Sequence, residues 1–144
     1  QMRGIVFDLP EAIPLAKEVI AATDVADRIS FAAGDFFKDA LPAGDLYALG
    51  RILHDWNPEQ NAAILAKIYA AAPVGGGVLV CEKILHDDKS GPEPAVLQSL
   101  NMLVCTEGKE RTLGEYEQLL TAAGFREVTA CRTGSPLDAI LPVT

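Results

Sequence analysis

The chain has 144 residues, of which 49% are hydrophobic and 22% are charged, as expected for one globular domain with a workable core. Its formal net charge of −8 argues against a nucleic-acid partner, because binding to phosphates needs a basic surface. No apolar run is long enough to cross a membrane, and we see no signal peptide before the first predicted strand. We therefore expect a cytoplasmic protein with no membrane and no nucleic-acid partner.

Three cysteines occur, Cys81, Cys105 and Cys131, and their spacing is not that of metal ligands. An odd number of cysteines in a cytosolic protein predicts reduced thiols, and we expect them to be buried. The chain opens on a glutamine without a polar leader, so we expect it to be part of a longer protein.

Strand and helix patterns alternate from the start of the chain. Residues 4–7 form an apolar run that ends in Asp8, which is typical of a buried parallel strand. Pro10 predicts the start of a helix, since proline is favoured in the first turn. Residues 28–31 predict a second strand, and residues 45–49 begin a third.

The next helix has the clearest signals. Asn57 suits the N-cap, Pro58 the first helical position and Gln60 the third position of a capping box. The helix should end before a glycine-rich turn at residues 75–77, and a buried strand should follow and close at Glu82.

A polar loop over residues 86–94 precedes a helix predicted for residues 96–103. Thr112 and Glu115 form a second capping-box pattern, and Gly124 ends that helix. Residues 128–132 and 137–141 then predict a closing antiparallel pair of strands. The order of elements predicts one α/β domain over residues 1–144, with a mainly parallel sheet.

A histidine stands at the end of an apolar run, at residues 46–53. This residue, His54, is followed by Asp55 and by Trp56, the only tryptophan of the chain. A buried strand that ends in this way brings a base to the rim of a sheet, where ligands of open α/β folds bind. The arrangement favours an enzyme.

Several segments together resemble S-adenosylmethionine-dependent O-methyltransferases of the acetylserotonin (hydroxyindole) and plant-phenol type. The resemblance runs nearly end to end and in order, whereas a lone His-Asp-Trp would carry little weight. The segments that carry it are residues 6–10, 34–37, 51–56, 75–77, 99–103 and 106–112, continued by Phe125 and residues 138–141.

The resemblance implies a Rossmann-like class I methyltransferase sheet that lacks its first strand. The family places a Gly-rich loop after that strand and a helical dimerisation region before it, and neither is in this chain. The missing strand lies between the strands that end at Asp8 and begin at Leu46, so each should have an unpaired edge. We expect the chain alone to have a distorted or oligomerised sheet and to bind the cofactor weakly, and the whole protein to be a homodimer.

The resemblance implies S-adenosylmethionine as the cofactor. Asp8, at a strand end, would accept the ribose hydroxyls, as in dinucleotide folds, although it could instead cap the following helix. Arg51, expected to be buried at a strand end, would pair with the charged amino-acid end of the cofactor. The alternative is a structural ion pair between Arg51 and a nearby glutamate.

The segment after the second strand is implied to contact the adenosine. Gly34 would let the backbone approach closely, Asp35 would accept from the adenine amine, and Phe36 would offer a ring face or edge. The alternative is an ordinary strand-end turn with the aromatic rings in the core, which is the interpretation we favour for Phe37.

The resemblance makes His54 the general base. Phenols and hydroxyindoles have pKa values near 10, and a neutral imidazole of pKa near 6.5 can take their proton as the oxygen attacks a methyl group. Glu82 and Glu110 match acidic residues that flank this histidine in the plant enzymes and orient it. Surface glutamates are the alternative, above all for Glu110 in its charged run.

Asp55 and Asn101 match substrate-contacting positions of the hydroxyindole enzymes. The alternative for Asp55 is local helix capping near Asn57. Cys105 is a departure, because the vertebrate hydroxyindole enzyme has glutamine there, and a thiol is smaller and a poor hydrogen-bond donor. The departure bears on which aromatic hydroxyl is the acceptor and leaves the chemistry unchanged.

We therefore expect methyl transfer to a small aromatic hydroxyl. No metal site is expected, because neither histidine, His54 or His86, belongs to a wider cluster of ligand-type residues in the sequence. A second hypothesis is a non-catalytic methyltransferase-like domain that binds a nucleoside or serves in assembly. A third, a nicotinamide-dependent dehydrogenase, is disfavoured because no G-x-G-x-x-G follows a strand.

Overall fold

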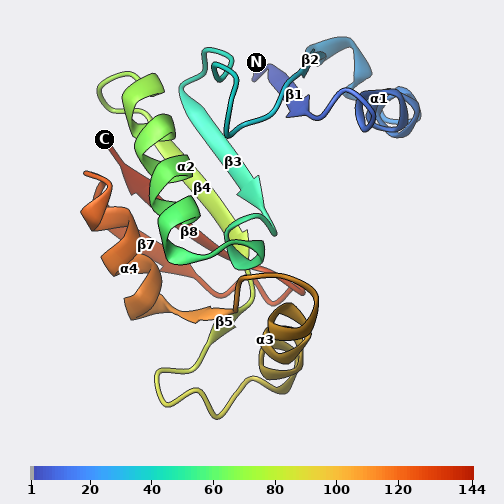
Figure 1. The fold of residues 1–144 in the computed structure, drawn as a ribbon. Helices are drawn as coiled ribbons and strands as arrows, with labels where there is room; N and C mark the ends of the chain where they lie inside the picture. The colour runs from blue at the N-terminus through green and yellow to red at the C-terminus, as the bar shows by residue number, and fades with distance from the viewer. Residues whose placement is uncertain (1) are drawn as a thin grey trace. The chain divides into compact units, whose positions relative to one another are not determined.

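The computed structural model describes residues 2–144 and divides into two compact units, a first unit that ends at Ala43 and a second unit, Gly44–Thr144 (Figure 1). Both contain parallel strands and helices, as the alternating sequence pattern predicts.

The first unit contains β1 (Gly4–Asp8), α1 (Ile13–Ala21), the short helix η1 (Ala26–Arg28) and β2 (Ile29–Ala33). The two strands pair in parallel, so that their carboxyl ends meet with Asp8 opposite Ala33. The predicted helix start at Pro10 is wrong. The residues after Pro10 form a turn in which the Ala12 N–H donates to the Leu9 carbonyl at 2.9 Å, and the first turn of α1 takes Pro14 instead.

The second unit is built on four strands, β3 (Leu46–Gly50), β4 (Gly77–Glu82), β7 (Arg126–Cys131) and β8 (Asp138–Val143), in the order β3-β4-β8-β7. The pair β3-β4 is parallel, and β8 is antiparallel to both of its neighbours. The predicted closing antiparallel pair is therefore confirmed. Among residues 2–144, β1 pairs only with β2 and β3 only with β4, so each has one unpaired edge, as expected.

Two helices cover one face of this four-stranded sheet, α2 (Pro58–Ala71) and α4 (Leu113–Ala122) (Figure 1). The core of the second unit lies between them and the strands, where removal of apolar side chains from water stabilises the fold. The buried side chains of this core include Ile64, Leu65, Ile68, Val78, Val80, Tyr116, Leu120, Phe125 and Ile140.

No helix in the described part of the chain is both long and apolar enough to cross a bilayer.

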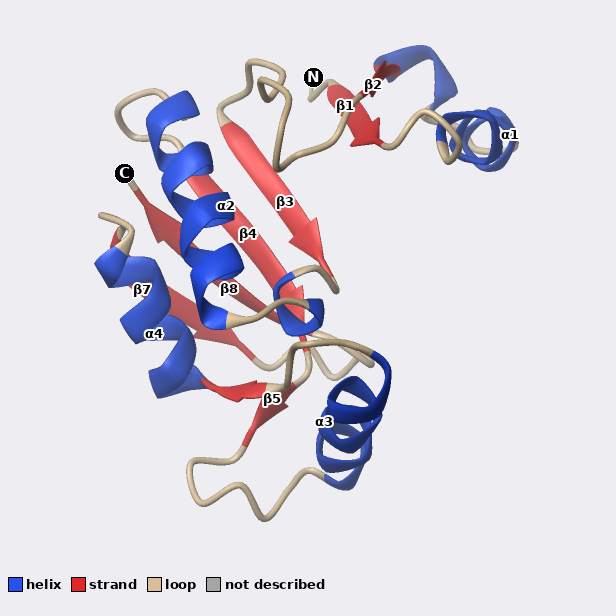
Figure 2. Cartoon of the chain, in the orientation of Figure 1, coloured by secondary structure: helices blue, strands red, loops and turns tan. Residues whose placement is uncertain are grey.

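Shorter elements gather beyond the ends of β3 and β4 (Figure 2). They are the short helix η2 (Leu53–Asp55), β5 (Ile84–Leu85), α3 (Glu93–Cys105) and β6 (Arg111–Thr112). The strand β5 pairs in parallel with β6, with Ile84 opposite Arg111. The predicted apolar strand through Leu53 instead ends at Gly50, because Arg51 has a left-handed backbone with φ of 57° and turns the chain out of the sheet.

Both predicted N-caps are present, but only one capping box is complete. The Thr112 hydroxyl accepts from the Glu115 N–H at 3.2 Å, and the Glu115 carboxylate accepts from the Thr112 N–H at 2.9 Å. The Asn57 side chain accepts from the Gln60 N–H at 2.9 Å. The Gln60 side-chain oxygen is buried and finds no hydrogen-bond partner in residues 2–144, so the return half of the first box is missing.

All three thiols are free, but the expectation that they are buried is wrong for two of them. Cys81, in β4, is half-buried, whereas Cys105 and Cys131 are exposed. The two exposed thiols lie on the last residue of α3 and on the last residue of the edge strand β7, where the core does not reach.

Substitution of Thr112 by alanine removes the N-cap of α4 and should lower the free energy of unfolding by about 1 kcal/mol. Urea denaturation of the chain measures the change. Thr121→Ala, an exposed position in the last turn of the same helix, is the matched control and should be neutral or slightly stabilising, since alanine is the better helix former. Equal stabilities of the two variants would contradict the role of the cap.

Candidate active site

The turn that carries His54 is held by the end of the neighbouring strand. β3 ends at Gly50, and the chain enters η2 through the left-handed Arg51. Glu82 is the last residue of β4, and its Oε1 atom accepts hydrogen bonds from the backbone N–H groups of Ile52 at 3.0 Å and Leu53 at 2.9 Å. The carboxylate therefore takes the place that a sheet partner would have for this turn.

The imidazole of His54 is buried between carboxylates. It is 2% exposed, and its Nδ1 atom lies 2.7 Å from Oε1 of Glu110 and 3.5 Å from Oε2 of Glu82. The two glutamates are 1% and 0% exposed, so the alternative that they are surface residues is wrong. A carboxylate at Nδ1 places the proton there, which leaves the lone pair of Nε2 as the basic site.

The charges of this cluster shift its titration. Burial lowers the pKa of His54, but the hydrogen bond to Glu110 and the nearby carboxylates outweigh burial, so the pKa is raised above its ordinary 6.5. Burial raises the pKa of Glu82 from 4.5 to about 7, and Glu110 adds to the rise, while the charge of His54 and hydrogen bonds from the backbone of the turn oppose it. The titrations of His54 and Glu82 are therefore coupled to each other.

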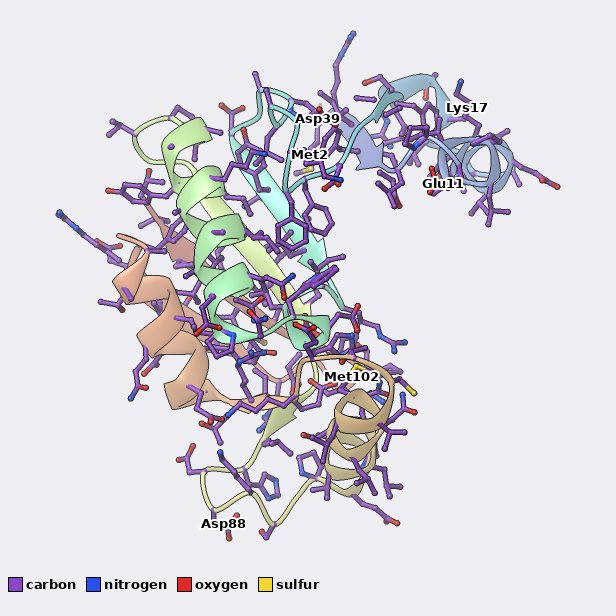
Figure 3. All side chains as sticks on the ribbon, in the orientation of Figure 1. Met2, Glu11, Lys17, Asp39, Asp88 and Met102 are labelled. Carbon is purple, nitrogen blue, oxygen red and sulfur yellow. The ribbon has the colours of Figure 1, made fainter. Side chains whose placement is uncertain are left out.

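The expectation that His54 stands outside any cluster of ligand-type residues is wrong. One ligand atom from each of His54, Glu82 and Glu110 lies within 4.8 Å of the others. These groups bind one another and the backbone through hydrogen bonds, an arrangement typical of a base with supporting carboxylates. The other segment, around His86, is exposed, and Figure 3 shows Asp88 on the outer side of its loop.

The three residues predicted to contact the methyl-acceptor substrate lie on η2 and α3. Oδ1 of Asp55 is 3.5 Å from Nε2 of His54, beside the basic nitrogen. Asn101 and Cys105 are one turn apart on α3, where the thiol donates to the Asn101 side-chain oxygen at 3.6 Å, and both are exposed. Between them, Met102 is buried on the side of α3 that faces η2 (Figure 3). Their contact with an acceptor stays a prediction.

Arg51 is exposed, so the expected buried guanidinium is wrong. The left-handed backbone at this residue, with φ of 57°, takes the side chain out of the strand. No carboxylate of residues 44–144 forms an ion pair with it, so the structural alternative is not seen either. Such a backbone is uncommon outside glycine and is enriched at ligand sites. Cofactor contact by Arg51 stays a prediction.

The predicted adenosine residues meet at the carboxyl end of the first unit's sheet. The N–H of Gly34 donates to the carbonyl of Asp8 at 2.9 Å, so the two strand ends lie side by side. A Cβ atom on Gly34 would lie 2.5 Å from the ring of Phe7, which explains the glycine. Asp8 is exposed, and its Oδ1 accepts from the next N–H, that of Leu9, at 2.7 Å. It does not cap α1.

Asp35 has local partners that the sequence analysis did not foresee. Its carboxylate accepts from the Phe37 N–H at 2.8 Å and lies 2.8 Å from the ammonium of Lys38. These contacts, with the Lys38 hydrogen bond foremost, lower the pKa of Asp35 and keep it ionised. The rings of Phe36 and Phe37 are tilted against each other with centroids 4.8 Å apart, and both are half-buried. The segment thus presents an acceptor beside aromatic surface.

Two buried residues that contact the His54 turn were missed in the sequence. Asn61, on α2, and Arg111, on β6, donate hydrogen bonds to backbone carbonyls of that turn. Asn61 lies four residues after the predicted N-cap and Arg111 in a charged run, and neither was singled out as a candidate. No local pattern distinguishes a cation that binds distant carbonyls.

Comparison with known proteins identifies the family of the chain. Residues 1–126 match the model of the O-methyltransferase domain family. The chain is 52% identical over 139 residues to acetylserotonin O-methyltransferase of Bos taurus, across 96% of this chain and 40% of that protein. The crystal structure of human N-acetylserotonin methyltransferase in complex with S-adenosylmethionine matches with a TM-score of 0.92 and 46% identity, over 99% of this chain and 40% of that one.

A second solved structure, an O-methyltransferase family 2 protein from Planctomyces limnophilus in complex with apigenin, matches with a TM-score of 0.92 and 35% identity, over 99% of this chain and 43% of that one. The mixed α/β architecture is thus that of the class I methyltransferases, which confirms the predicted fold class. The chain belongs to the O-methyltransferase domain family, as its motifs indicate. It spans about two fifths of the length of the acetylserotonin enzyme that it matches.

The titration of Glu82 should make the chain less stable as pH rises. Because its folded pKa of about 7 exceeds the ordinary 4.5, the folded chain retains a proton that the unfolded chain releases, so stability falls between these two pH values. The shift corresponds to a loss of at most about 3 kcal/mol. Glutamine can still accept from the two N–H groups but cannot ionise, so Glu82→Gln should flatten this part of the profile.

Urea denaturation at several pH values across that interval measures the effect. Glu117→Gln, an exposed position on α4, is the matched control and should keep the profile of the unsubstituted chain. If Glu82→Gln showed the same fall in stability as the unsubstituted chain, the carboxyl group would not be the titrating one.

Proposed function

We propose that the protein to which this chain belongs transfers a methyl group from S-adenosylmethionine to an aromatic hydroxyl, with His54 as the general base. The observation that carries the proposal is the buried contact of 2.7 Å between Nδ1 of His54 and Glu110, which fixes the imidazole with Nε2 as its basic atom. Membership of the O-methyltransferase domain family supports the class of reaction.

Removal of the hydroxyl proton is the step of the reaction that residues of this chain can carry out. A phenol or hydroxyindole has a pKa near 10, so at neutral pH it needs a base as its oxygen attacks the methyl carbon. Nε2 of His54 takes the hydroxyl proton, and the resulting imidazolium is stabilised by Glu110 and Glu82. When bound, S-adenosylmethionine supplies an electrophilic methyl group on a positively charged sulfur, which leaves as a neutral thioether.

The first unit offers groups that fit the adenosine part of this cofactor. The exposed carboxylate of Asp8 can accept the ribose hydroxyls, and Gly34 leaves room for close approach at the same strand ends. The ionised Asp35 and the ring of Phe36 suit the adenine amine and its flat face. Arg51, on the second unit, is assigned to the carboxylate of the cofactor's amino-acid end. The human relative's structure contains S-adenosylmethionine, which supports this assignment.

The acceptor is assigned to a small aromatic hydroxyl. One relative is named for acetylserotonin and another was solved with apigenin, and both compounds carry an aromatic hydroxyl. Asp55 lies beside the basic nitrogen of His54 and is assigned to hold the acceptor there, with Asn101 and Cys105 on the facing helix. We further propose that the whole protein is a cytoplasmic homodimer. A non-catalytic role is disfavoured, because the base and both of its carboxylates are assembled.

The two histidines of the chain provide a matched pair of variants. His54→Gln in the full-length protein should lower kcat by about 100- to 10,000-fold, the usual contribution of a general base. It should leave S-adenosylmethionine binding unchanged, as measured by calorimetry. His86→Gln removes the exposed histidine and should leave kcat unchanged. Methyl transfer at the normal rate by His54→Gln would remove the role assigned to this residue.

The pH profile tests the support from Glu110. The base acts only when neutral, so kcat/KM should fall as pH drops through the raised pKa of His54, above its ordinary 6.5. Glu110→Gln keeps an acceptor for Nδ1 but removes the negative charge, so the acidic limb should move to lower pH and the maximal rate should decrease. The exposed Glu117→Gln is the control. An unmoved limb in Glu110→Gln would show that another group limits the rate.

A further inference from the structure

We propose that Arg111, together with Asn61, is a positioning residue that fixes the backbone of the His54 turn and thereby aims the imidazole. The inference rests on the proposed function of His54 as the base. Neither residue contacts the imidazole in the structure. Both act on the peptide groups on either side of it.

The guanidinium of Arg111 spans the turn. Its Nη1 atom donates to the carbonyl of Leu53 at 2.8 Å and to that of Lys109 at 3.1 Å, and its Nη2 atom donates to the carbonyl of Trp56 at 3.2 Å. The residue is 3% exposed, and no carboxylate of residues 44–144 forms an ion pair with it. Burial of a cation is costly, and the hydrogen bonds to these three carbonyls offset part of that cost.

Asn61 binds the same two carbonyls from the opposite element. Its amide nitrogen, on α2, donates to Leu53 O at 2.9 Å and to Trp56 O at 3.0 Å, and the residue is fully buried. Two independent donors from two elements thus converge on the carbonyls that precede and follow His54. One donor would already satisfy each carbonyl. The second donor therefore serves to fix the geometry of the turn.

The N–H side of the turn is held separately by Glu82, which accepts from Ile52 and Leu53. The short helix η2 cannot satisfy these groups itself, since a single turn of this kind leaves most of its backbone without partners. The turn is therefore bound at its N–H groups by β4 and at its carbonyls by α2 and β6. Its position is set by these contacts, not by its own hydrogen bonds.

The segment around Arg111 binds both the backbone of the turn and the imidazole ring. Glu110, which accepts from Nδ1, is the adjacent residue, so one stretch of chain fixes both the imidazole and the turn beneath it. Gly108 lies so close to the turn that an added Cβ atom would be 1.9 Å from the carbonyl oxygen of His54. The contact is closed to anything larger than glycine.

The chemistry explains why arginine is used here. The guanidinium is a flat fork whose nitrogens can donate to two carbonyls at once, whereas the ammonium of lysine is a point donor. Methyl transfer needs the acceptor oxygen, the methyl carbon and the base in one arrangement, and a displacement of about 1 Å at the base can cost on the order of 100-fold in rate. Losing the fork should thus reduce the rate before it reduces cofactor binding.

The kinetic test uses Arg111→Lys, Arg111→Met and Asn61→Ala in the full-length protein. We expect kcat to decrease on the order of 10- to 100-fold for Arg111→Met and by less for Arg111→Lys. The KM for S-adenosylmethionine should change less than about 3-fold, because the groups that we assign to it are not altered. Arg111→Lys with Asn61→Ala together should lose more than the product of the two single effects, since each single variant keeps the other donor.

A spectroscopic test reads the imidazole directly. The chain has only two histidines, so the ring nitrogen resonances of His54 are assigned by comparison with His86→Gln. In the unsubstituted chain we expect one tautomer with the proton on Nδ1, and in Arg111→Met a mixture of tautomers. This measurement is made on the 144-residue chain and needs no methyl transfer.

Thr112→Ala is the matched control. Thr112 follows Arg111 and caps α4, so this substitution lowers the stability of the fold and leaves every contact of the His54 turn in place. A loss of kcat in Thr112→Ala equal to that in Arg111→Met would overturn the proposal, because general destabilisation would then explain both. An unchanged kcat and a single tautomer in Arg111→Met would also overturn it. Should Arg111→Met fail to fold, Arg111→Lys and Asn61→Ala decide by the same criteria.

The two proposals fail in different ways. If His54→Gln kept its methyl transfer, the base would be wrong, yet the tautomer measurement would still report whether Arg111 holds the ring. If His54→Gln lost activity while the Arg111 and Asn61 variants kept both rate and tautomer, the base would stand and the positioning role would be wrong.

Discussion

The hydrogen bond between Nδ1 of His54 and Oε1 of Glu110 joins two segments that are 56 residues apart in the chain. One segment is the turn that leaves β3, and the other is the loop that enters β6. The turn is also held by Glu82, Asn61 and Arg111, and the contact with Glu110 ties it to the loop. This contact orients the imidazole and sets its tautomer, and both of its members are buried.

The site also shows how a fold supports a buried cluster of ionisable groups. Burial alone would neutralise the imidazole and both carboxyl groups. The imidazole lies within hydrogen-bonding or short ionic distance of both carboxylates. It offsets part of the effect of burial on Glu82, whereas Glu110 adds to that effect, and the pKa of Glu82 is about 7. Glu82 therefore changes charge near neutral pH, 3.5 Å from the imidazole whose protonation the proposed reaction requires.

Much of this arrangement could be predicted from the sequence, because its signals are local or run in order along the chain. The cap at Thr112, the closing strand pair and the order of strands follow from spacing, and Glu82 followed from its place at a strand end and from family resemblance. Arg51 could not be placed, because a left-handed residue after β3 leaves no sequence signature except glycine, which is absent there. Asn61 and Arg111 were missed because their partners are carbonyls, which every residue carries.

The two glutamates beside His54 differ in what their loss from a relative of this chain would indicate, because one supports the fold and the other supports the imidazole. One oxygen of Glu82 binds the backbone of the turn, so a descendant that had ceased to methylate anything would still gain folding stability by keeping it. The side chain of Glu110 makes its hydrogen bond to the imidazole, and its second oxygen finds no partner within residues 2–144. A relative that has lost the glutamate at position 110 but keeps the one at position 82 is thus expected to have lost methyl transfer while keeping the fold.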